Sequence, residues 1–185
     1  MKHTLLTPVL VAGCLCALLP TGRAATELKI PNAGFEEQLN QWENQEDNGM
    51  SKVSAGAAHG GKVGLHVTDD SEERGSALYS QKISVNPGAT YEVQFWGRVL
   101  SGSGIGVYLR FLGADGKSVS SSDEDKAAER TPVVNLDKNQ GSWKLMSGQK
   151  TAPAGATSVV IFIHSYAKFM VTADVDDFVL SEVNK

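Results

Sequence analysis

Residues 90–100 place a tryptophan among side chains that are well suited to binding hydroxyl groups. Side chains of a β-strand alternate between its two faces, so Glu92, Gln94, Trp96 and Arg98 share one face of this stretch. The residues between them are apolar or aromatic and predict a core face. A solvated face usually carries Lys, Thr, Ser and Glu. A large Trp flanked by Gln and Arg therefore indicates a binding surface.

Two further stretches repeat this arrangement of polar and aromatic side chains. In residues 104–112, Tyr108 and Arg110 alternate with apolar residues, and in residues 157–166 Phe162, His164 and Tyr166 do the same. We expect the three strands to present these side chains on one shared surface. Sugar rings stack on Trp or Tyr, and their hydroxyls bond to planar partners such as Arg, Gln and Glu. The predicted carbohydrate site comprises Glu92, Gln94, Trp96, Arg98, Tyr108, Arg110, His164 and Tyr166.

Two other interpretations of this surface stay open. Outward aromatic side chains also pack against covering loops, with arginine shielding them. Protein interfaces favour Tyr, Trp and Arg as well, so the same surface could belong to a structural or adhesion subunit that contacts another protein.

The elements that must position these residues are strands. Helical periodicity is nearly absent, and short alternating runs recur between Gly, Pro, Asn, Asp and Ser. This pattern predicts one all-β domain over residues 25–185, without internal repeats, and a long loop over residues 118–139. Seven strands are expected, at residues 62–68, 77–85, 90–100, 104–112, 142–149, 157–166 and 170–182.

The first 24 residues have the composition of a signal peptide. Lys2 precedes an apolar run over residues 5–19, and small residues follow at positions 20–24. Pro8 and Gly13 interrupt the run, which is shorter than the roughly 20 residues of a membrane-spanning helix. We expect a secreted or periplasmic protein. Lipidation at Cys14 is the alternative, because Val11-Ala12-Gly13-Cys14 fits a bacterial lipobox.

Removal of this leader changes the chemistry of the chain. Both cysteines, Cys14 and Cys16, would be lost, so the remaining chain would contain no disulfide. Removing Lys2 and Arg23 from the 17 basic residues leaves 15 against 21 acidic ones, a net charge of −6. Such a surface argues against nucleic acid or anionic lipid as a partner.

Five sequence blocks, in this order, resemble the carbohydrate-binding modules of the family four and family nine type. The blocks are Asn-Ala-Gly-Phe-Glu at 32–36, His-Gly-Gly-Lys-Val-Gly-Leu at 59–65, Val-Asn-Pro-Gly-Ala-Thr-Tyr at 85–91, Thr-Ala-Pro-Ala-Gly-Ala at 151–156 and Val-Asp-Asp-Phe-Val-Leu at 175–180. The resemblance covers residues 28–183. It implies a β-sandwich jelly roll of the galactose-binding type, with ligand residues on its concave face at Trp96, Arg98, Tyr108 and Arg110.

The resemblance also implies a structural calcium ion. Its ligands would be the side chains of Glu36 and Asp176, completed by backbone carbonyls of Asn32 or Gly34 and of Lys62. Oxygen ligands of this kind suit a hard cation. Asp177 is expected to point outward. The implied partner is a poly- or oligosaccharide, and a glycan-degrading enzyme could accompany the module, although the chain shows no attached catalytic domain.

The sequence predicts no catalytic activity. A glycosidase needs two carboxylates at a set distance across one cleft, and no such pair is evident. His59, His66 and His164 do not form a metal-binding cluster in the sequence. A jelly-roll polysaccharide lyase, the less favoured alternative, would need a set such as Arg98, His164 and Tyr166, and the local motifs expected around these residues are missing.

Overall fold

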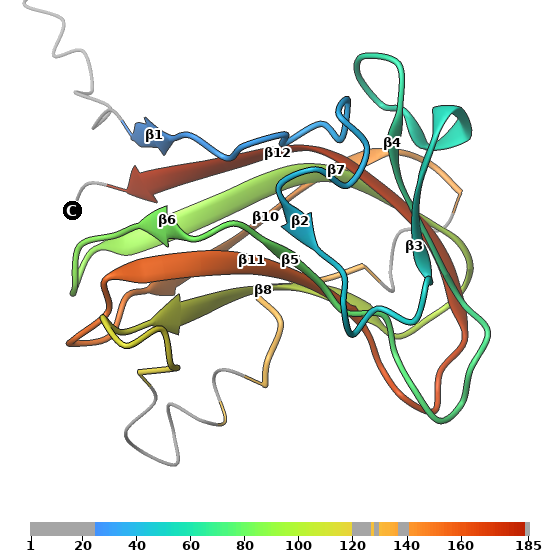
Figure 1. Cartoon of the computed structure of the whole chain (residues 1–185). Coiled ribbons are helices and arrows are strands. Elements are labelled where there is room, and N and C mark those ends of the chain that lie inside the picture. Colours follow the sequence, from blue (N-terminus) through green and yellow to red (C-terminus); the bar gives the residue numbers. More distant parts are fainter. Residues whose placement is uncertain (1–24, 120–126, 128–129, 137–140, 184–185) are drawn as a thin grey trace, which may run out of the picture.

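The computed structural model describes residues 25–119, 127, 130–136 and 141–183. Its strands form two antiparallel sheets (Figure 1). Sheet A has the strand order β10-β7-β12-β4-β3, with β1 beside β12, and sheet B has the order β2-β5-β11-β8-β9, with β6 beside β11. The strands are β1 (Thr26–Leu28), β2 (Trp42–Glu43), β3 (Ser51–Ser54), β4 (Gly64–Asp69), β5 (Leu78–Ser80), β6 (Ile83–Ser84), β7 (Thr90–Gly102), β8 (Ile105–Leu112), β9 (Val134–Asn135), β10 (Lys144–Thr151), β11 (Ser158–Ser165) and β12 (Val171–Val183); one 3₁₀ turn, η1 (Ala55–Ala57), precedes β4.

The core lies between the inner faces of the two sheets, as the alternating pattern predicts. On β7, Tyr91, Val93, Phe95 and Val99 are fully buried, and their neighbours point away from the core. The inner faces of β8 and β11 contribute apolar residues in the same alternation. The all-β jelly-roll prediction is confirmed.

An aromatic cluster closes the core beneath the first sequence block. Phe35 lies 4.9 Å from the Trp42 ring and 6.1 Å from the Phe178 ring, centroid to centroid. Phe178 in turn stacks on Phe95 at 4.9 Å. The cluster joins the N-terminal segment to β12 and β7, so the blocks of the sequence that lie far apart along the chain meet in one place.

Every predicted strand is present, with shifted ends, and residues 77–85 form two short strands, β5 and β6, in place of one. Four strands were not predicted: β1, β2, β3 and β9. Each is two to four residues long, which is too short for an alternating pattern to show. Strand β9 lies inside the predicted loop 118–139, and its Val134 is buried in the core. Residues 120–126, 128–129 and 137–140 of that loop lie outside the described residues.

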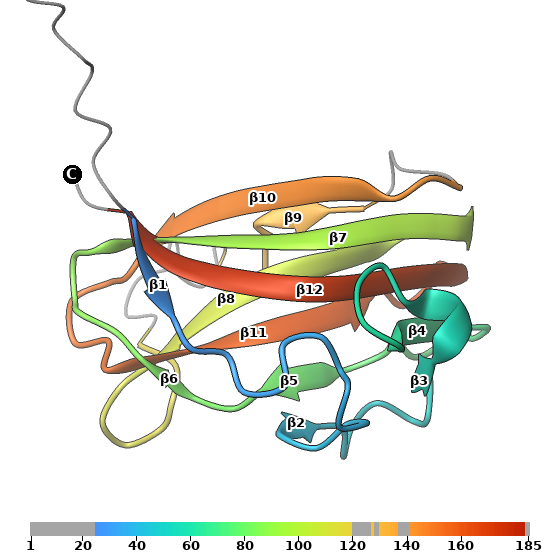
Figure 2. The ribbon, with the colours of Figure 1, turned by 90° about the horizontal axis from the view of Figure 1, so that it is seen from above.

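Strand β12 runs through the middle of sheet A and pairs with β7, β4 and β1. It pairs with β7 along its length, as Figure 2 shows from above, and with β4 over its first half. Its last residues pair with β1, with Leu28 opposite Leu180. A register shift between Asp176 and Val179 interrupts the β7 pairing, and Asp177 there has a positive φ of 54°.

The predicted signal peptide, with Cys14 and Cys16, lies outside the described residues. No helix within the described ranges is long and apolar enough to cross a membrane.

Candidate functional site

The predicted ligand-binding residues do not share one surface, because their strands belong to different sheets. Strand β7 pairs with β10 and β12 in sheet A, whereas β8 and β11 pair with each other in sheet B. The short connection at Ser103-Gly104 therefore crosses from one sheet to the other, and the expected single surface is wrong. The outer face of sheet A carries Glu92, Gln94, Trp96 and Arg98, and the outer face of sheet B carries Tyr108, Arg110, His164 and Tyr166.

An aromatic layer covers the outer face of sheet B. Tyr108 and Phe162 are 4% and 2% exposed, although they point away from the core. Tyr79 of β5 stacks on Phe162 with a centroid distance of 4.3 Å and an interplanar angle of 13°. His164, two residues further along β11 on the same face, stacks on the same ring at 5.0 Å. Tyr108 is thus a buried part of this aromatic layer and is not accessible to a ligand.

Arg110 lies on this aromatic layer. Its Cζ is 3.8 Å from the centroid of the Phe162 ring, and its Nη1 donates a hydrogen bond to the Tyr79 hydroxyl at 3.1 Å. A guanidinium over an aromatic face is stabilised by the charge distribution of the ring. The position of this cation is therefore fixed before any ligand arrives.

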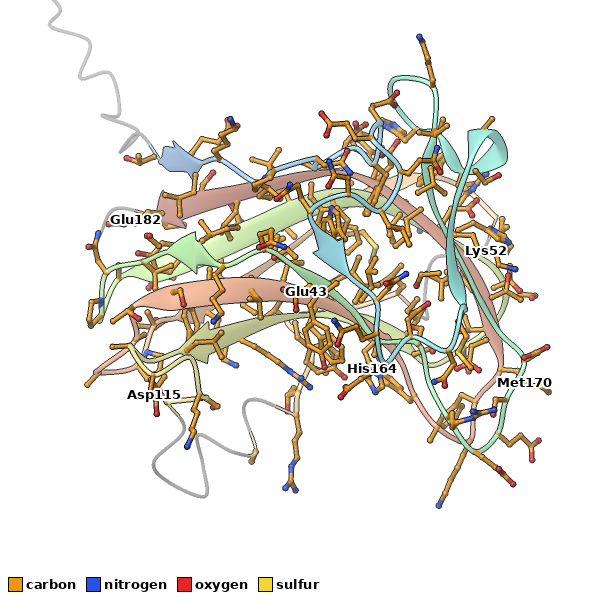
Figure 3. All side chains as sticks on the ribbon, in the orientation of Figure 1. Glu43, Lys52, Asp115, His164, Met170 and Glu182 are labelled. Carbon is orange, nitrogen blue, oxygen red and sulfur yellow. The ribbon has the colours of Figure 1, made fainter. Side chains whose placement is uncertain are left out.

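A groove of about 600 Å³ opens beside Arg110 on sheet B. Leu112 and Val160 contribute its apolar surface. Figure 3 labels Glu43, which enters the lining from β2, and His164, which lies outside it on β11. The groove offers an aromatic ring, cations and carboxylates in one place, on a scale that suits a few sugar rings. Its charged and aromatic lining residues are Glu43, Glu46, Tyr79, Lys82, Arg110 and Arg130.

Of the eight predicted ligand residues, Arg110 alone is among the lining residues of this groove. Tyr79, for which the sequence predicts a place in a strand but no role in binding, also lines the groove. The signal for Tyr79 was present, since it alternates with the buried Leu78 and Ser80 and so points outward. Glu43 gave no such signal, because β2 has only two residues.

His164 is held as a neutral imidazole at one end of the aromatic layer. Burial is the largest influence on its pKa and lowers it, and the neighbouring Arg110 charge lowers it further. The Ser76 carbonyl, which accepts a hydrogen bond from Nδ1, and the Asp69 carboxylate act in the opposite direction. Burial also raises the pKa of the Tyr108 hydroxyl. Both groups are uncharged near neutral pH, so Arg110 supplies the charge of this layer.

The outer face of sheet A is occupied by contacts within the chain. The His59 ring stacks on Trp96 at 4.0 Å with an interplanar angle of 11°. Arg98 donates from Nε to the buried Asp174 at 2.8 Å, donates from Nη2 to the Gly56 carbonyl at 2.7 Å, and lies 4.5 Å above the Trp143 ring. Trp96 and Arg98 thus hold the 55–63 loop against the sheet.

Three other side-chain contacts occupy the outer face of sheet A. His66 Nδ1 lies 2.6 Å from Asp174 Oδ1, so Asp174 is shared between a histidine and an arginine. Glu92 accepts hydrogen bonds from the amides of Gln94 and Gln149. The predicted polar residues of β7 therefore bond to neighbours in the fold.

The predicted calcium ligands Glu36 and Asp176 meet at the same 55–63 loop. Asp176 is fully buried, and its Oδ2 accepts hydrogen bonds from the backbone of His59 and Gly60. Glu36 Oε1 accepts from the backbone of Lys62 and Val63. Burial raises the pKa of Asp176, while the two backbone donors lower the pKa of Glu36.

These residues fit a hard cation in kind. Within the described ranges, Asp176 has no cationic side chain within ion-pair distance, which leaves a buried carboxylate without a countercharge. No three acidic, histidine or cysteine side chains of the described residues form a metal-binding group, so carbonyls would have to complete the shell. The Asn32 carbonyl already accepts from Phe35 N and Trp42 Nε1, which favours Gly34 and Lys62. Asp177, expected to be solvated, is half-exposed and binds the His59 ring at 2.8 Å.

The set considered for a lyase is not assembled. Arg98 lies on sheet A, whereas His164 and Tyr166 lie on the outer face of sheet B. The two groups are therefore separated by the full thickness of the sandwich.

Comparison with known proteins agrees with the fold. A family model described as a carbohydrate binding domain matches residues 29–168. No curated protein matches the chain. Among solved structures, a family 16 carbohydrate-binding module is 19% identical with a TM-score of 0.59, and the match covers 83% of this chain and 99% of that one.

Two further structures are similar. The family 22 xylan-binding domain of Paenibacillus barcinonensis Xyn10C is 16% identical with a TM-score of 0.60, covering 88% of this chain and 99% of its own. The TmCBM61 module, solved in complex with β-1,4-galactotriose, is 20% identical with a TM-score of 0.52, covering 84% and 99%. At these identities the likeness shows the fold.

Proposed function

The chain belongs to the carbohydrate-binding domain family whose model it matches, and on this premise we propose that it holds a poly- or oligosaccharide in the groove of sheet B. In this proposal the protein is exported, to the periplasm or beyond the cell, and binds its glycan without catalysis. The alternative is that the exported protein is anchored to a membrane by a lipid at Cys14.

The observation that carries the proposal is the position of Arg110 and Tyr79 in the groove. Tyr79 supplies a ring for stacking, and Arg110 supplies donors for sugar oxygens. The carboxylates of Glu43 and Glu46 would accept from sugar hydroxyls. The corresponding side chains of sheet A are not available to a ligand, because His59 already covers Trp96 and Asp174 already binds Arg98.

Replacing Tyr79 by alanine should weaken glycan binding about fivefold or more, because a stacked aromatic ring contributes roughly 1 to 3 kcal/mol. Affinity electrophoresis of the protein against a panel of neutral and acidic polysaccharides measures this as a loss of retardation. Leu145→Ala, which removes an apolar side chain that is 56% exposed on sheet A, is the matched control and should leave retardation unchanged.

Two results would contradict the assignment to sheet B. Equal retardation of the Tyr79→Ala variant and the unaltered protein would show that the glycan does not contact this ring. Retardation by no polysaccharide of the panel would favour a protein-contact role for the domain.

We also propose a structural calcium ion held by the carboxylates of Glu36 and Asp176 and by carbonyls of Gly34 and Lys62. The ion would neutralise the buried Asp176 and join the N-terminal segment, the 55–63 loop and β12. Such an ion stabilises the folded state in proportion to the logarithm of its concentration.

Calcium at about 100 times its dissociation constant should raise the melting temperature by roughly 5 to 10 °C, which corresponds to about 2.7 kcal/mol. Differential scanning fluorimetry with calcium and with a chelator measures this shift. Asp176→Asn should abolish the response, and Asp70→Asn, a change at an exposed carboxylate, should retain it. A melting temperature that is the same in both conditions would exclude the ion.

A further inference from the structure

We propose that the groove of sheet B selects acidic glycans, with Arg110 binding the carboxylate of a uronic acid residue. This inference rests on the proposed function, and it adds the chemical class of the ligand.

The two outward-facing arginines, Arg98 on β7 in sheet A and Arg110 on β8 in sheet B, differ in their partners. Arg98 forms a salt bridge to Asp174 at 2.7 Å, so its charge is neutralised within the fold. Arg110 bonds to the Tyr79 hydroxyl, which is uncharged, and no carboxylate of the described residues lies within ion-pair distance of it. The structure therefore leaves the charge of Arg110 available to a ligand.

The guanidinium of Arg110 is also positioned for a planar anion. Phe162 lies 3.8 Å beneath it, and the rings of Tyr79 and Tyr108 lie 5.6 and 5.9 Å away. These contacts restrict the side chain, so little further conformational entropy would be lost on binding. An arginine held in this way presents parallel N–H groups that match the two oxygens of a carboxylate.

The charges around Arg110 favour an anion with hydroxyl groups. Lys82 and Arg130 also line the groove, so its lining holds three cations against the two carboxylates of Glu43 and Glu46. Within the described ranges none of these five side chains pairs with another. A uronic acid offers both partners, a carboxylate for the cations and hydroxyls for the glutamates.

A neutral sugar would be a poorer match for the same groove. Covering Arg110 with any sugar removes water from the guanidinium, and burying a charge without a countercharge is costly. A carboxylate restores the lost solvation by a charge-assisted pair. The preference should therefore be for the acidic form of a given glycan over its neutral form.

The test compares each acidic polysaccharide with its own neutral derivative. Polygalacturonate and alginate are used directly and after reduction of their carboxyl groups to alcohols, and binding is measured by isothermal titration calorimetry. Dextran sulfate serves as a polyanion without uronic acid. The variants are Arg110→Gln, which removes the charge, and Arg110→Lys, which keeps the charge without the planar fork. Lys144→Gln, on the exposed edge of sheet A, is the matched control for loss of one positive charge.

We expect at least one uronate polymer to bind about tenfold or more tightly than its reduced form. Arg110→Gln should bring the two affinities together, Arg110→Lys should lower the ratio severalfold, and Lys144→Gln should leave it unchanged. Circular dichroism of each variant verifies folding.

Three outcomes would overturn the inference. Equal affinity for acidic and reduced polymers would leave the carbohydrate-binding proposal intact and remove the acidic preference. Equal binding of dextran sulfate would indicate unspecific attraction of polyanions. Binding to none of these polymers, nor to any neutral glycan of the wider panel, would remove the proposed function together with the inference.

Discussion

Replacing Asp174 by alanine should lower the free energy of unfolding by about 3 kcal/mol, the cost typical of removing one partner from a buried ion pair. Asp174 is 1% exposed, and it receives Arg98 at 2.7 Å and His66 at 2.6 Å. Without it, the half-buried Arg98 keeps its charge but loses its countercharge. The melting temperature should fall by roughly 6 to 12 °C, as measured by thermal denaturation.

A double variant separates the ion pair from the packing around it. Arg98→Met together with Asp174→Leu removes both charges and keeps apolar volume, and replacing a whole buried pair is often nearly neutral. We expect the double variant to recover most of the stability that Asp174→Ala loses. If Asp174→Ala melts within one or two degrees of the unaltered protein, solvent reaches Arg98 and the pair contributes little.

Replacing Gly64 by alanine should have a comparable effect, about 3 kcal/mol, the upper part of the range for overpacking. A Cβ at this position would collide with the Ala57 carbonyl oxygen and lie 3.2 Å from Asp176 Cγ. The 55–63 loop would have to move away from sheet A, and its hydrogen bonds to Asp176 and Glu36 would be lost. Urea denaturation measures the loss of stability.

Gly56 provides the control for this prediction. A Cβ there would meet Ser54 Oγ at 3.6 Å, an ordinary contact, and Gly56→Ala should be tolerated. The Gly64→Ala variant should also lose any stabilisation by calcium, because the carboxylates no longer share the loop. A variant with unchanged stability would mean that the loop lies against sheet A more loosely than its contacts indicate.

The sequence predicts which side chains of each long strand point into the core between the sheets, and it does so correctly for β7, β8 and β11. What it cannot predict is the sheet to which each strand belongs. Ser103-Gly104 has the composition of a hairpin turn, and a hairpin would have placed Trp96 and Tyr108 on one surface. The chain crosses between sheets there because β7 already has β10 and β12 as partners on its two sides.

The groove of sheet B could not be predicted from the sequence, for a related reason. Tyr79 and Glu43 come from strands of three and two residues, and both depend on pairing with distant segments. The covering of Trp96 by His59 is likewise a contact between a loop and a strand 37 positions apart, which no local pattern encodes. By contrast, Glu36 and Asp176, which the family resemblance placed together, both accept hydrogen bonds from the backbone of residues 59–63.

The pairing of β1 with the end of β12 sets how the domain responds to mechanical force. Thr26 lies opposite Glu182 and Leu28 opposite Leu180, so the two strands run antiparallel from neighbouring ends. A force that pulls these ends apart loads the three residue pairs one after another, as in opening a zipper, and β1 peels off at low load. The β7–β12 pairing is longer and includes residues of the core. It would bear the load only after β1 has detached. Tethered by its ends, the domain would lengthen by a short segment first and keep its groove intact.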